Sequence, residues 1–317
     1  MSNPIDGELV HGAHRGTAVV TGAAGFIGSH LVTALTGLGL PVVGVDRRWI
    51  GDEVDEPAWG VAGELASMDL DRVLRDATVV FHLAGRPGVR RSWDSFAGYL
   101  QDNILVTQRL LDACVRSGVS RVVLASSSSV YGDAVPMAED RLPSPMSPYA
   151  VTKLAAEHLG RTYAARGTGM VVVAMRYFTV YGPGQRPDML VSRALRSALT
   201  GEVLQVYGDG EDQRDFTYVG DVVAATIRAA SADVPGGVYN VGTGTSTSVN
   251  DLLTYVAEVS GHAPRVRYVE SRAGDVPVTC ADLTKSAGKL GYRATVPLPR
   301  GIAEQASALD AALQRAR

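Results

Sequence analysis

Three kinds of feature are scarce in this sequence, and each absence excludes a class of protein. No apolar run reaches the roughly 18 residues of a membrane-spanning helix, so no membrane partner is expected. The net charge of −3 gives no electrostatic basis for binding nucleic acid. Cys114 and Cys280 lie far apart and form no C-x-x-C pair, so neither a disulfide framework nor a zinc site is expected, and a reducing cytoplasm fits.

Histidine clusters are missing as well. The 6 histidines stand at positions 11, 14, 30, 82, 158 and 262, with no H-E-x-x-H or comparable spacing. We therefore expect no metal centre. His82 ends an apolar run, where a structural role explains it better than a catalytic one.

The length and composition are those of a globular enzyme. With 317 residues and 33.4 kDa, the chain can form one large domain or two modest ones, each with its own core. Its 35 glycines imply many tight turns or close backbone approaches. Residues 1–15 contain no apolar segment and are expected to form a short disordered leader.

Short β-branched runs alternate with longer amphipathic segments from Thr17 onward, as "TAVVT", "PVVGVD", "ATVVFHLAG", "RVVLASSSS" and "MVVVAMRYF" show. Runs that are apolar throughout suit strands buried on both faces of a parallel sheet, and right-handed crossovers make such a sheet doubly wound. Between two of these runs, apolar residues from Leu100 to Val115 recur at helical spacing, and Gly118 is a typical stop signal.

The pattern changes after Tyr181, where glycine, proline and charged residues become frequent and the apolar runs less regular. This change indicates a second, smaller lobe. We predict an α/β fold built on a doubly wound, Rossmann-like parallel sheet. Its cofactor domain covers residues 16–180, the chain returns to it near 219–245, and the smaller substrate-binding lobe lies within 181–317.

A glycine-rich turn follows the first apolar run. In "VVTGAAGFIGSH", Gly22, Gly25 and Gly28 suit a tight turn, a close approach of pyrophosphate to backbone N–H groups, and a helix N-terminus that carries partial positive charge. Asp46 ends the next run, where a carboxylate can accept hydrogen bonds from the adenosine ribose hydroxyls. Asp46 favours NAD over NADP, although the arginines at 47 and 48 leave NADP open.

Tyr149 and Lys153 are spaced i, i+4 on a helix that is expected to begin near Pro148. A lysine cation one turn away, together with an oxidised nicotinamide, favours the phenolate and so should lower the pKa of the tyrosine. Tyr149 can then take a proton from a substrate hydroxyl. By itself this spacing is common in helices, and it gains weight only beside the glycine turn and Asp46.

A row of hydroxyls, Ser126 to Ser129, follows another apolar run. Ligands of doubly wound sheets bind at the carboxyl ends of the strands, so one of these hydroxyls can hold the reacting oxygen of a substrate. A serine-rich turn can also cap its own backbone, and we expect that role for at least one of the four.

Together these residues resemble the extended short-chain dehydrogenase/reductase family, specifically its nucleotide-sugar epimerases and dehydratases. The resemblance runs from Thr17 to Gly301. In the first half it rests on the glycine turn, Asp46, "MDL", "HLAG", Asn103, "SSSSVYG" and the Tyr149–Lys153 pair. In the second half it rests on "RYFTVYGP", "RDFTYVGD", "YNVGTG" and "SRAGD".

The resemblance implies roles for individual residues. It makes Ser127, Tyr149 and Lys153 the catalytic residues, with Lys153 also binding the nicotinamide ribose. The implied NAD-binding residues are Gly22, Gly25, Phe26, Ile27, Gly28, Asp46, Arg47, Asp69, Leu70, Leu83, Ala84, Gly85, Asn103, Tyr149, Lys153 and Tyr177. The implied substrate-binding residues are Arg86, Ser127, Ser128, Ser129, Tyr149, Thr179, Arg186, Arg214, Arg272 and Asp275.

The sugar is predicted to be a uronic acid. Family 4,6-dehydratases carry Asp-Glu directly before "VYG", whereas Ser128 and Ser129 stand there in this chain and cannot act as acid and base at neutral pH. Hydroxyls can instead hold a fixed carboxylate, and "AGRPGVRRSW" adds three arginines near the same strand ends. Thr179 replaces the asparagine of hexose epimerases, while Gly184 departs from the bulkier residue that is common after that proline.

"FTVYGPGQRPDM" with "PGVRRSW" is most similar to UDP-glucuronate 4-epimerases, which implies NAD-dependent interconversion of UDP-glucuronate and UDP-galacturonate through a 4-keto sugar. The alternatives are a 4-epimerase of neutral UDP- or TDP-hexoses, a UDP-glucuronate decarboxylase and a 4-ketoreductase. A non-catalytic dinucleotide sensor is the alternative from another class. The resemblance also implies a homodimer, because the helices that contain Leu100 to Val115 and Tyr149 to Gly160 form a four-helix interface in many family members.

Overall fold

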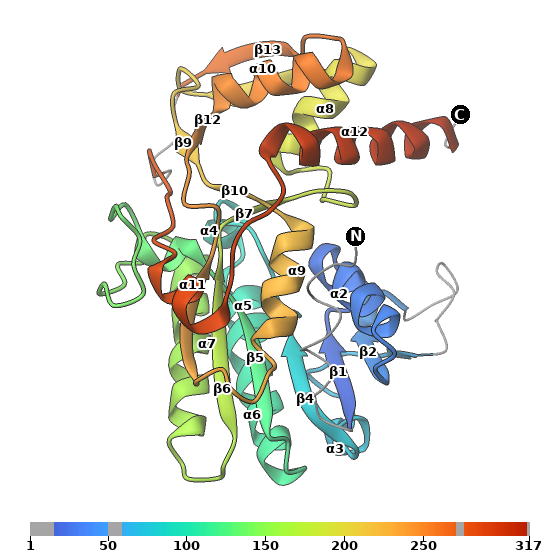
Figure 1. Ribbon diagram of the computed structural model, residues 1–317, viewed down its shortest axis with the longest axis vertical. Helices are drawn as coiled ribbons and strands as arrows, with labels where there is room; N and C mark the ends of the chain where they lie inside the picture. Colours follow the sequence, from blue (N-terminus) through green and yellow to red (C-terminus); the bar gives the residue numbers. More distant parts are fainter. Residues whose placement is uncertain (1–15, 50–58, 271–275, 316–317) are drawn as a thin grey trace.

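A parallel sheet of seven strands organises the structure (Figure 1). This is a computed structural model, and it describes residues 16–49, 59–270 and 276–315. The strand order is β11-β6-β5-β4-β1-β2-β3, with every neighbouring pair parallel. The strands are β1 (Thr17–Thr21), β2 (Val42–Asp46), β3 (Gly60–Ala62), β4 (Ala77–His82), β5 (Arg121–Ser127), β6 (Val171–Tyr177) and β11 (Gly237–Val241).

Helices cover both faces of this sheet, which explains why its strands are apolar on both sides. One core joins Val20 and Val123 to α2 (Phe26–Gly37) and α9 (Val219–Arg228). The other joins the neighbouring strand residues Val19 and Val122 to α6 (Val106–Arg116). The predicted doubly wound, Rossmann-like fold is therefore confirmed.

The helix predicted over 100–115 is regular only in its second half. A π-helical turn, η2 (Leu100–Leu105), precedes α6, and the helix ends at Arg116, two residues before Gly118 with its φ of +69°. Leu100 is 38% exposed, whereas Asn103 in the same turn is buried. A π-turn inserts one extra residue per turn and so rotates the side chains that follow, and such turns are frequent at functional sites.

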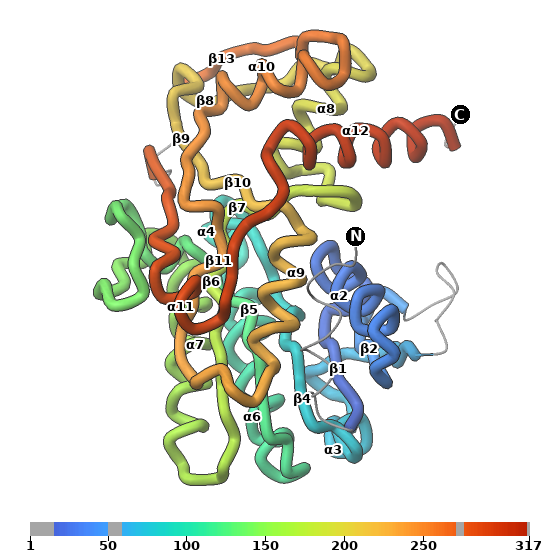
Figure 2. The backbone as a smooth tube through the Cα atoms, in the orientation of Figure 1, coloured from blue at the N-terminus to red at the C-terminus, as the bar shows by residue number. Residues whose placement is uncertain are grey.

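A smaller lobe lies above the sheet in Figure 2. Its core is formed by α8 (Leu190–Thr200), α10 (Val249–Ser260) and α12 (Leu298–Arg315), with the parallel strands β8 (Val203–Tyr207) and β13 (Arg265–Val269) alongside. Two further strand pairs connect it to the sheet, namely β7 (Thr179–Tyr181) with β10 (Phe216–Tyr218), and β9 (Gln213–Arg214) with β12 (Thr247–Ser248). Helix α7 (Pro148–Ala164) is long, and the remaining short elements are η1 (Arg47–Trp49), α3 (Leu70–Val73), α4 (Arg91–Asp94), α5 (Phe96–Tyr99), η3 (Ser128–Tyr131) and α11 (Thr284–Leu290).

The chain leaves the large sheet after β6 and comes back to it. Helix α9 packs against α2, and β11 pairs with β6 in parallel before the chain returns to the lobe. These contacts support the proposed division into a cofactor domain over 16–180, with a return near 219–245, and a smaller lobe drawn from 181–317. The proposed leader, residues 1–15, lies outside the described residues.

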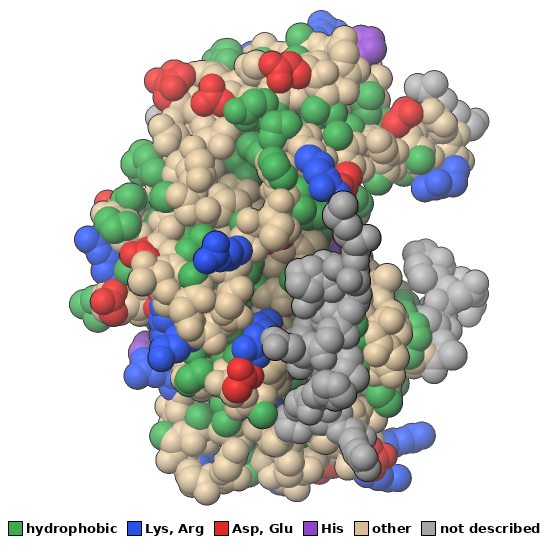
Figure 3. All heavy atoms as spheres, viewed as in Figure 1, with side chains coloured by type: hydrophobic (Ala, Val, Ile, Leu, Met, Phe, Trp, Pro, Cys, Tyr) green, Lys and Arg blue, Asp and Glu red, His purple; other side chains and the backbone are tan. Residues whose placement is uncertain are grey.

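On the face seen in Figure 3, basic and acidic side chains are interspersed with hydrophobic ones over the part of the chain that is described. Among the described residues, no helix has the length and apolarity needed to cross a membrane. No group of three or more possible metal ligands occurs among them either.

Candidate active site

The glycine turn has no room for larger residues. Gly22 has a φ of +72°, and a Cβ added there would lie 2.7 Å from the backbone nitrogen of Ala84. A Cβ on Gly28 would lie 2.1 Å from the carbonyl oxygen of Gly22. Gly25 is the N-cap of α2 and gives the helix no side-chain cap, so the first N–H groups of α2 point out of an uncapped N-terminus. This cradle fits the pyrophosphate of a dinucleotide.

Asp46 is fixed at the end of β2 by backbone donors. Its carboxylate accepts hydrogen bonds from the N–H of Ala24 at 3.0 Å and from that of Arg48 at 2.9 Å. The guanidinium of Arg47 lies 3.8 Å from Glu64 and 3.6 Å from Asp102, while that of Arg48 lies 3.7 Å from Asp46. Because both arginines already face carboxylates, this corner of the site suits two ribose hydroxyls better than a 2′-phosphate.

The residues after β4 are held by Asn103. Its side-chain oxygen accepts from the N–H of Arg86 at 2.7 Å, and its amide donates to the carbonyl of Arg86 at 3.1 Å and to Thr152 at 3.0 Å. Leu83 donates its N–H to Thr21 at 3.1 Å, and a Cβ on Gly85 would lie 2.9 Å from the Asn103 oxygen. The π-turn thus places a buried amide where it fixes the segment Leu83 to Gly85 beside Gly22.

His82 has the structural role expected of it. One ring nitrogen lies 2.8 Å from the Thr21 hydroxyl, and the other lies 3.0 Å from the Thr107 hydroxyl. Burial, with a smaller contribution from the Lys153 charge, lowers the pKa of His82 to about 3. A neutral ring therefore joins β4 to β1 and α6 below the site.

Asp69 and Leu70 lie at the start of α3. Asp69 caps this short helix by accepting the N–H of Arg72 at 3.2 Å, and Leu70 is buried in the core. Sequence reasoning missed Arg109 of α6, which donates to the carbonyls of Leu65 and Met68, each at 2.7 Å. Arg109 belongs to no motif, so the sequence could not show that it holds the segment from Leu65 to Met68.

Helix α7 carries the predicted base and lysine. Ser147 caps it by accepting the N–H of Ala150 at 3.1 Å, and Pro148 occupies its first turn. Tyr149 is hydrogen-bonded to Ser127 at the end of β5, and Lys153 donates to the carbonyl of Ala125 at 2.9 Å. The structure therefore brings together the three residues predicted to be catalytic.

The lowered pKa expected for Tyr149 depends on Lys153 together with an oxidised nicotinamide, so it stays a prediction for the complex with NAD. Burial raises the pKa of Tyr149, and the hydrogen bond from Ser127 and the charge of Arg186 oppose this only in part. Burial also lowers the pKa of Lys153 to about 8, with the charge of Glu157 acting in the opposite direction. Desolvation is the largest effect on both groups.

Tyr99 is a second residue that the sequence did not reveal. Its ring meets that of Tyr149 edge to face, with 6.2 Å between the centroids. Its hydroxyl donates to the carbonyls of Pro87 and Gly88, which are both 2.9 Å away. Tyr99 thereby fixes the arginine-containing loop after β4 against the base.

The four serines divide into two roles. Ser126 is buried and donates to Glu157 of α7. The hydroxyl of Ser127 accepts from the N–H of Ser129 at 3.2 Å and from its hydroxyl at 2.9 Å, so one serine caps its own turn, as expected. Ser127, Ser128 and Ser129 are half-buried, and Ser127 is hydrogen-bonded to Tyr149.

Thr179 opens β7 directly after β6 ends. Its N–H donates to the carbonyl of Asp215 at 2.9 Å, and its side chain is half-buried. Tyr177 turns its hydroxyl to Thr226 of α9 at 2.7 Å, and Phe178 lies in the cluster around Tyr131. The aromatic side chains on either side are core residues, so Tyr177 has only its backbone to offer a cofactor.

The arginines near the site are largely paired. Arg86 lies 3.0 Å from Asp102, Arg186 lies 2.9 Å from Asp188, and Arg91 lies 3.8 Å from Asp188. Arg90 instead stacks over the ring of Tyr207 in the smaller lobe, at 4.3 Å from its centroid. The positive potential expected from this loop is thus reduced by carboxylates, but the charge of Arg186 still acts on Tyr149.

Arg214 lies between the two lobes on β9. Its guanidinium donates to the carbonyl of Gln213 at 2.8 Å and lies 3.5 Å from Asp212. Arg272 and Asp275 lie outside the described residues. The neighbouring Asp215, which we did not predict, is fully buried and accepts hydrogen bonds from the N–H groups of Thr243 at 2.7 Å and of Gly244 at 2.9 Å.

The loop after β7 is fixed from two sides. Gly182 donates its N–H to Gln305 of α12 at 2.8 Å, and a ring nitrogen of His30 in α2 lies 2.8 Å from the carbonyl of Pro183. Gly184, with a φ of +76°, lies near Phe26 at the start of α2. The loop that carries Arg186 is therefore placed over the glycine turn. Gln305 and His30 belong to no motif, so the sequence did not predict that they hold this loop.

Comparison with known proteins decides the family. Residues 18–242 match the model of the NAD dependent epimerase/dehydratase family, more than half of the chain. The chain belongs to this family. Its membership confirms the predicted family, NAD as the cofactor and epimerase as the enzyme class.

Three relatives illustrate the range of nucleotide sugars for which similar proteins are named or with which they were solved. MoeE5, solved with NAD and either UDP-glucuronic acid or UDP-glucose, is 50% identical, with a TM-score of 0.89 over 94% of this chain and 100% of that one. The UDP-glucuronic acid 4-epimerase from Bacillus cereus, solved with UDP-glucuronic acid and NAD, is 36% identical, with a TM-score of 0.86 over 93% and 99%. A UDP-glucose 4-epimerase of Mycolicibacterium smegmatis is 36% identical over 304 residues, 90% of this chain and 96% of the relative.

Proposed function

We propose that this epimerase interconverts UDP-glucuronate and UDP-galacturonate. The observation that carries the proposal is the hydrogen bond between Ser127 and Tyr149, with the half-buried hydroxyls of Ser128 and Ser129 next in the chain and the charge of Arg186 acting on Tyr149. Hydroxyl donors and one guanidinium suit a sugar carboxylate, and no acidic side chain stands in that row of serines to repel it or to drive dehydration. The similarity to MoeE5 and to the Bacillus cereus enzyme, both solved with UDP-glucuronic acid, supports the same substrate.

In this reaction each residue of the site would have its own role. Tyr149 takes the proton of the C4 hydroxyl, and Ser127, hydrogen-bonded to Tyr149, holds the same oxygen. Lys153, anchored on the Ala125 carbonyl, binds the nicotinamide ribose and stabilises the phenolate that results. Bound NAD would supply the hydride acceptor for C4 of the sugar and the hydride donor for the return step. Tyr149 gives its proton back to the C4 oxygen after the 4-keto sugar has turned over.

A uronic acid makes a further demand on the site. The 4-keto intermediate is a β-keto acid, which loses carbon dioxide when its carboxylate stands perpendicular to the ketone plane. We propose that the hydroxyls from Ser127 to Ser129, together with Thr179, hold the carboxylate away from that orientation. Arg214, with Arg272 and Asp275, is proposed to bind the nucleotide diphosphate and ribose, so that binding energy far from C4 positions the sugar.

One experiment tests the function. The purified protein is incubated separately with UDP-glucuronate and UDP-glucose, products are identified by NMR, and released carbon dioxide is measured. We expect UDP-galacturonate from the first substrate, little turnover of the second, no carbon dioxide and no net consumption of NAD or NADH.

The alternatives give different results in the same assay. Faster conversion of UDP-glucose identifies an epimerase of neutral hexoses, and stoichiometric carbon dioxide identifies a decarboxylase. Stoichiometric consumption of added NADH or NADPH identifies a ketoreductase. No turnover of any nucleotide sugar, with NAD bound, would favour a dinucleotide sensor.

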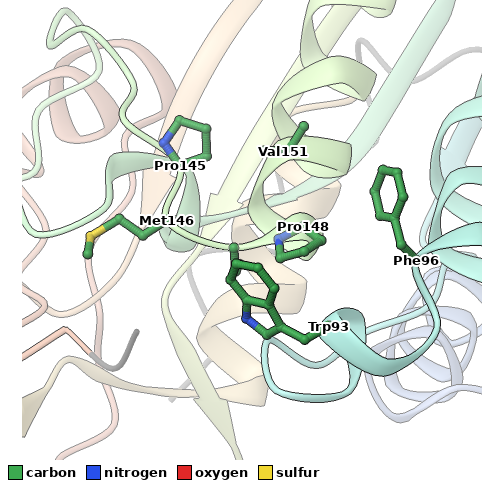
Figure 4. A pocket seen from close by; sticks show the side chains of 7 residues that line it. Trp93, Phe96, Pro145, Met146, Pro148 and Val151 are labelled. Carbon is green, nitrogen blue, oxygen red and sulfur yellow. The ribbon is translucent and has the colours of Figure 1, made fainter. Parts of the chain in front are cut away.

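We also propose that the enzyme is a homodimer formed through η2, α6 and α7. Several apolar side chains on adjoining elements of this region are exposed, namely Phe96 at 44%, Leu105 at 47% and Val151 at 45%. A pocket of about 430 Å³ opens among them, lined by Trp93 and Phe96 on one side and by Pro145 to Pro148 and Val151 on the other (Figure 4). A second copy of the same helices would remove this apolar surface from water.

Light scattering on a sizing column tests the dimer. We expect the mass of two chains, and the double change Leu105→Glu with Val151→Glu should give a folded monomer. A wild-type protein that has the mass of one chain at micromolar concentration would contradict the proposal.

A further inference from the structure

Helix α7 is fastened to β5 by three consecutive strand residues. Ser127 meets Tyr149, the carbonyl of Ala125 meets Lys153, and Ser126 between them meets Glu157. The helix partners are therefore spaced i, i+4 and i+8, so they share one face of α7. The first two contacts belong to the catalytic group, whereas Glu157 has no role in the proposed mechanism.

Glu157 is one half of a buried ion pair. Its carboxylate accepts from Arg176 of β6 at 2.9 and 2.7 Å, and the side chains of both residues are only 3% exposed. Arg176 is the register partner of Ser126 in the neighbouring strand, so one carboxylate serves both strands. The guanidinium also stacks on Tyr131, at 4.6 Å from its centroid, and one of its nitrogens has no hydrogen-bond partner among the described residues.

Stability alone does not explain such a pair. Removing two charges from water costs several kcal/mol per ion by order of magnitude, and apolar side chains of similar volume often serve a core as well. An unpaired guanidinium nitrogen in the interior adds to that cost. A buried carboxylate in this position has a further consequence, because Lys153 lies one helical turn away on the same face.

The surroundings of Lys153 contain no other negative charge that acts on it. Gly85 lies next to the ammonium group from the loop after β4, with 3.5 Å between the nitrogen and a Cβ built on that residue. His82 of β4 is neutral, and β5 contributes the carbonyl of Ala125. Tyr149 lies on α7 itself, and Arg176 reaches this region only through its pair with Glu157. Among the described residues, Glu157 is the charge that favours the ammonium form.

We propose that Glu157 is a positioning residue that keeps Lys153 protonated and aligned at neutral pH, and that the two hydrogen bonds from Arg176 hold the Glu157 carboxylate in place for this purpose. The proposal rests on the role proposed above for Lys153. It predicts that the two halves of one ion pair act on Lys153 in opposite directions. Loss of Glu157 removes the charge that favours the ammonium form and leaves Arg176 without its partner, whereas loss of Arg176 leaves the Glu157 charge in place.

The chain allows a direct measurement, because it contains only three lysines, at 153, 285 and 289. Protein labelled with 13C-lysine gives three Cε signals whose shifts follow the ionisation of each ammonium group, and the variants Lys285→Arg and Lys289→Arg assign them. The wild type is compared with Glu157→Gln, Arg176→Met and the double variant, all at saturating NAD. The double variant removes both members of the Arg176–Glu157 pair, so neither is left buried without the other, and it should fold even where Glu157→Gln does not.

The titration midpoint of Lys153 should move to lower pH by about one pH unit in Glu157→Gln, which is the low end for loss of a nearby opposite charge. It should move less in the double variant and should not fall in Arg176→Met, while Lys285 and Lys289 serve as internal references. With an active substrate, the alkaline limb of the kcat profile should move to lower pH with the Lys153 midpoint.

Equal downward shifts in all three variants, or no shift in either Glu157 variant, would overturn the proposal and leave a purely structural pair. The NMR titration needs no sugar substrate. Failure of the uronate assay and failure of this inference are therefore distinguishable.

Discussion

The two sides of the active site are built differently. On the sheet side, Tyr149 and Lys153 are held by contacts to β5 and lie against buried groups. On the loop side, Arg86 and Arg186 have side chains that are 38% and 35% exposed and are paired with carboxylates near them, Asp102 and Asp188. The sheet side is fixed by buried contacts, whereas the arginines of the loop side can leave their carboxylate partners and bind a ligand instead.

This difference separates chemistry from specificity. Surface ion pairs contribute little to stability, so Arg186 can leave Asp188 for a substrate carboxylate at small cost. Buried groups have no such freedom, and their pKa values are displaced by desolvation. We therefore expect changes on the sheet side to alter the rate or the stability greatly, and changes on the loop side to alter the choice of sugar.

The largest effect should come from Tyr149→Phe. Loss of the general acid–base hydroxyl should lower kcat by roughly 10³-fold, while the affinity for UDP-sugars stays near that of the wild type. Single-turnover absorbance at 340 nm and calorimetric binding measure the two quantities. Full residual activity would place the base elsewhere and break the division between the two sides.

Gly28→Ala should lower the free energy of unfolding by about 1–3 kcal/mol and weaken NAD binding, because the new methyl group would overlap the carbonyl of Gly22. Gly37→Ala is the matched control in the same helix, since a Cβ there meets nothing within 4 Å. The control should be neutral or stabilising by about 0.5–1 kcal/mol. Urea unfolding and NAD titration would show the contrast, and equal behaviour of both variants would contradict the geometry of the turn.

His82 should make the protein sensitive to acid. Its pKa falls from 6.5 in the unfolded chain to about 3 when folded, so between these values only the unfolded chain binds the proton. Stability should therefore decrease as pH falls through this window, by about 2 kcal/mol between pH 7 and pH 5 from this group. Measured by urea unfolding, the free energy of unfolding should fall less steeply with decreasing pH in His82→Gln than in the wild type. His158→Gln, a change at an exposed histidine, should leave the pH dependence of the wild type unchanged.

The smallest effect should come from Thr179→Ala. Loss of one hydrogen bond to a carboxylate should lower kcat/KM for UDP-glucuronate by about tenfold, and that for UDP-glucose much less. Parallel assays with both substrates measure the ratio. An equal loss for both sugars would show that Thr179 does not read the carboxylate.

Much of the fold could be predicted because its signals are local. Apolar strands, a glycine turn and a capped helix with proline in its first turn each follow from neighbouring residues, as β1, β5 and α7 show. The π-turn at Leu100–Leu105 could not be predicted, since the apolar spacing there also suits a regular helix. In this turn Asn103 is hydrogen-bonded to Arg86 and Thr152, which are 17 and 49 residues away in sequence, and local spacing cannot record such contacts.

The site shows the same limit. Motif residues such as Ser127 and Lys153 were identified, and the structure brings them together. Residues that act by holding others, such as Tyr99, Arg109 and Gln305, stand in no motif, because their partners are backbone atoms far away in sequence. In the chain by itself burial raises the pKa of Tyr149, an effect that the spacing of Tyr149 and Lys153 could not reveal because spacing does not record the depth of burial.

The return of β11 to the large sheet has a practical consequence for anyone who wishes to divide this protein. A chain cut after β6 would keep the glycine turn and the Tyr149–Lys153 pair, yet it would leave β6 as an open sheet edge and strip α9 from the face of α2. An open edge of apolar parallel strand invites aggregation. In a chimera of two relatives, residues 219–245 should therefore come from the same parent as the first 180 residues.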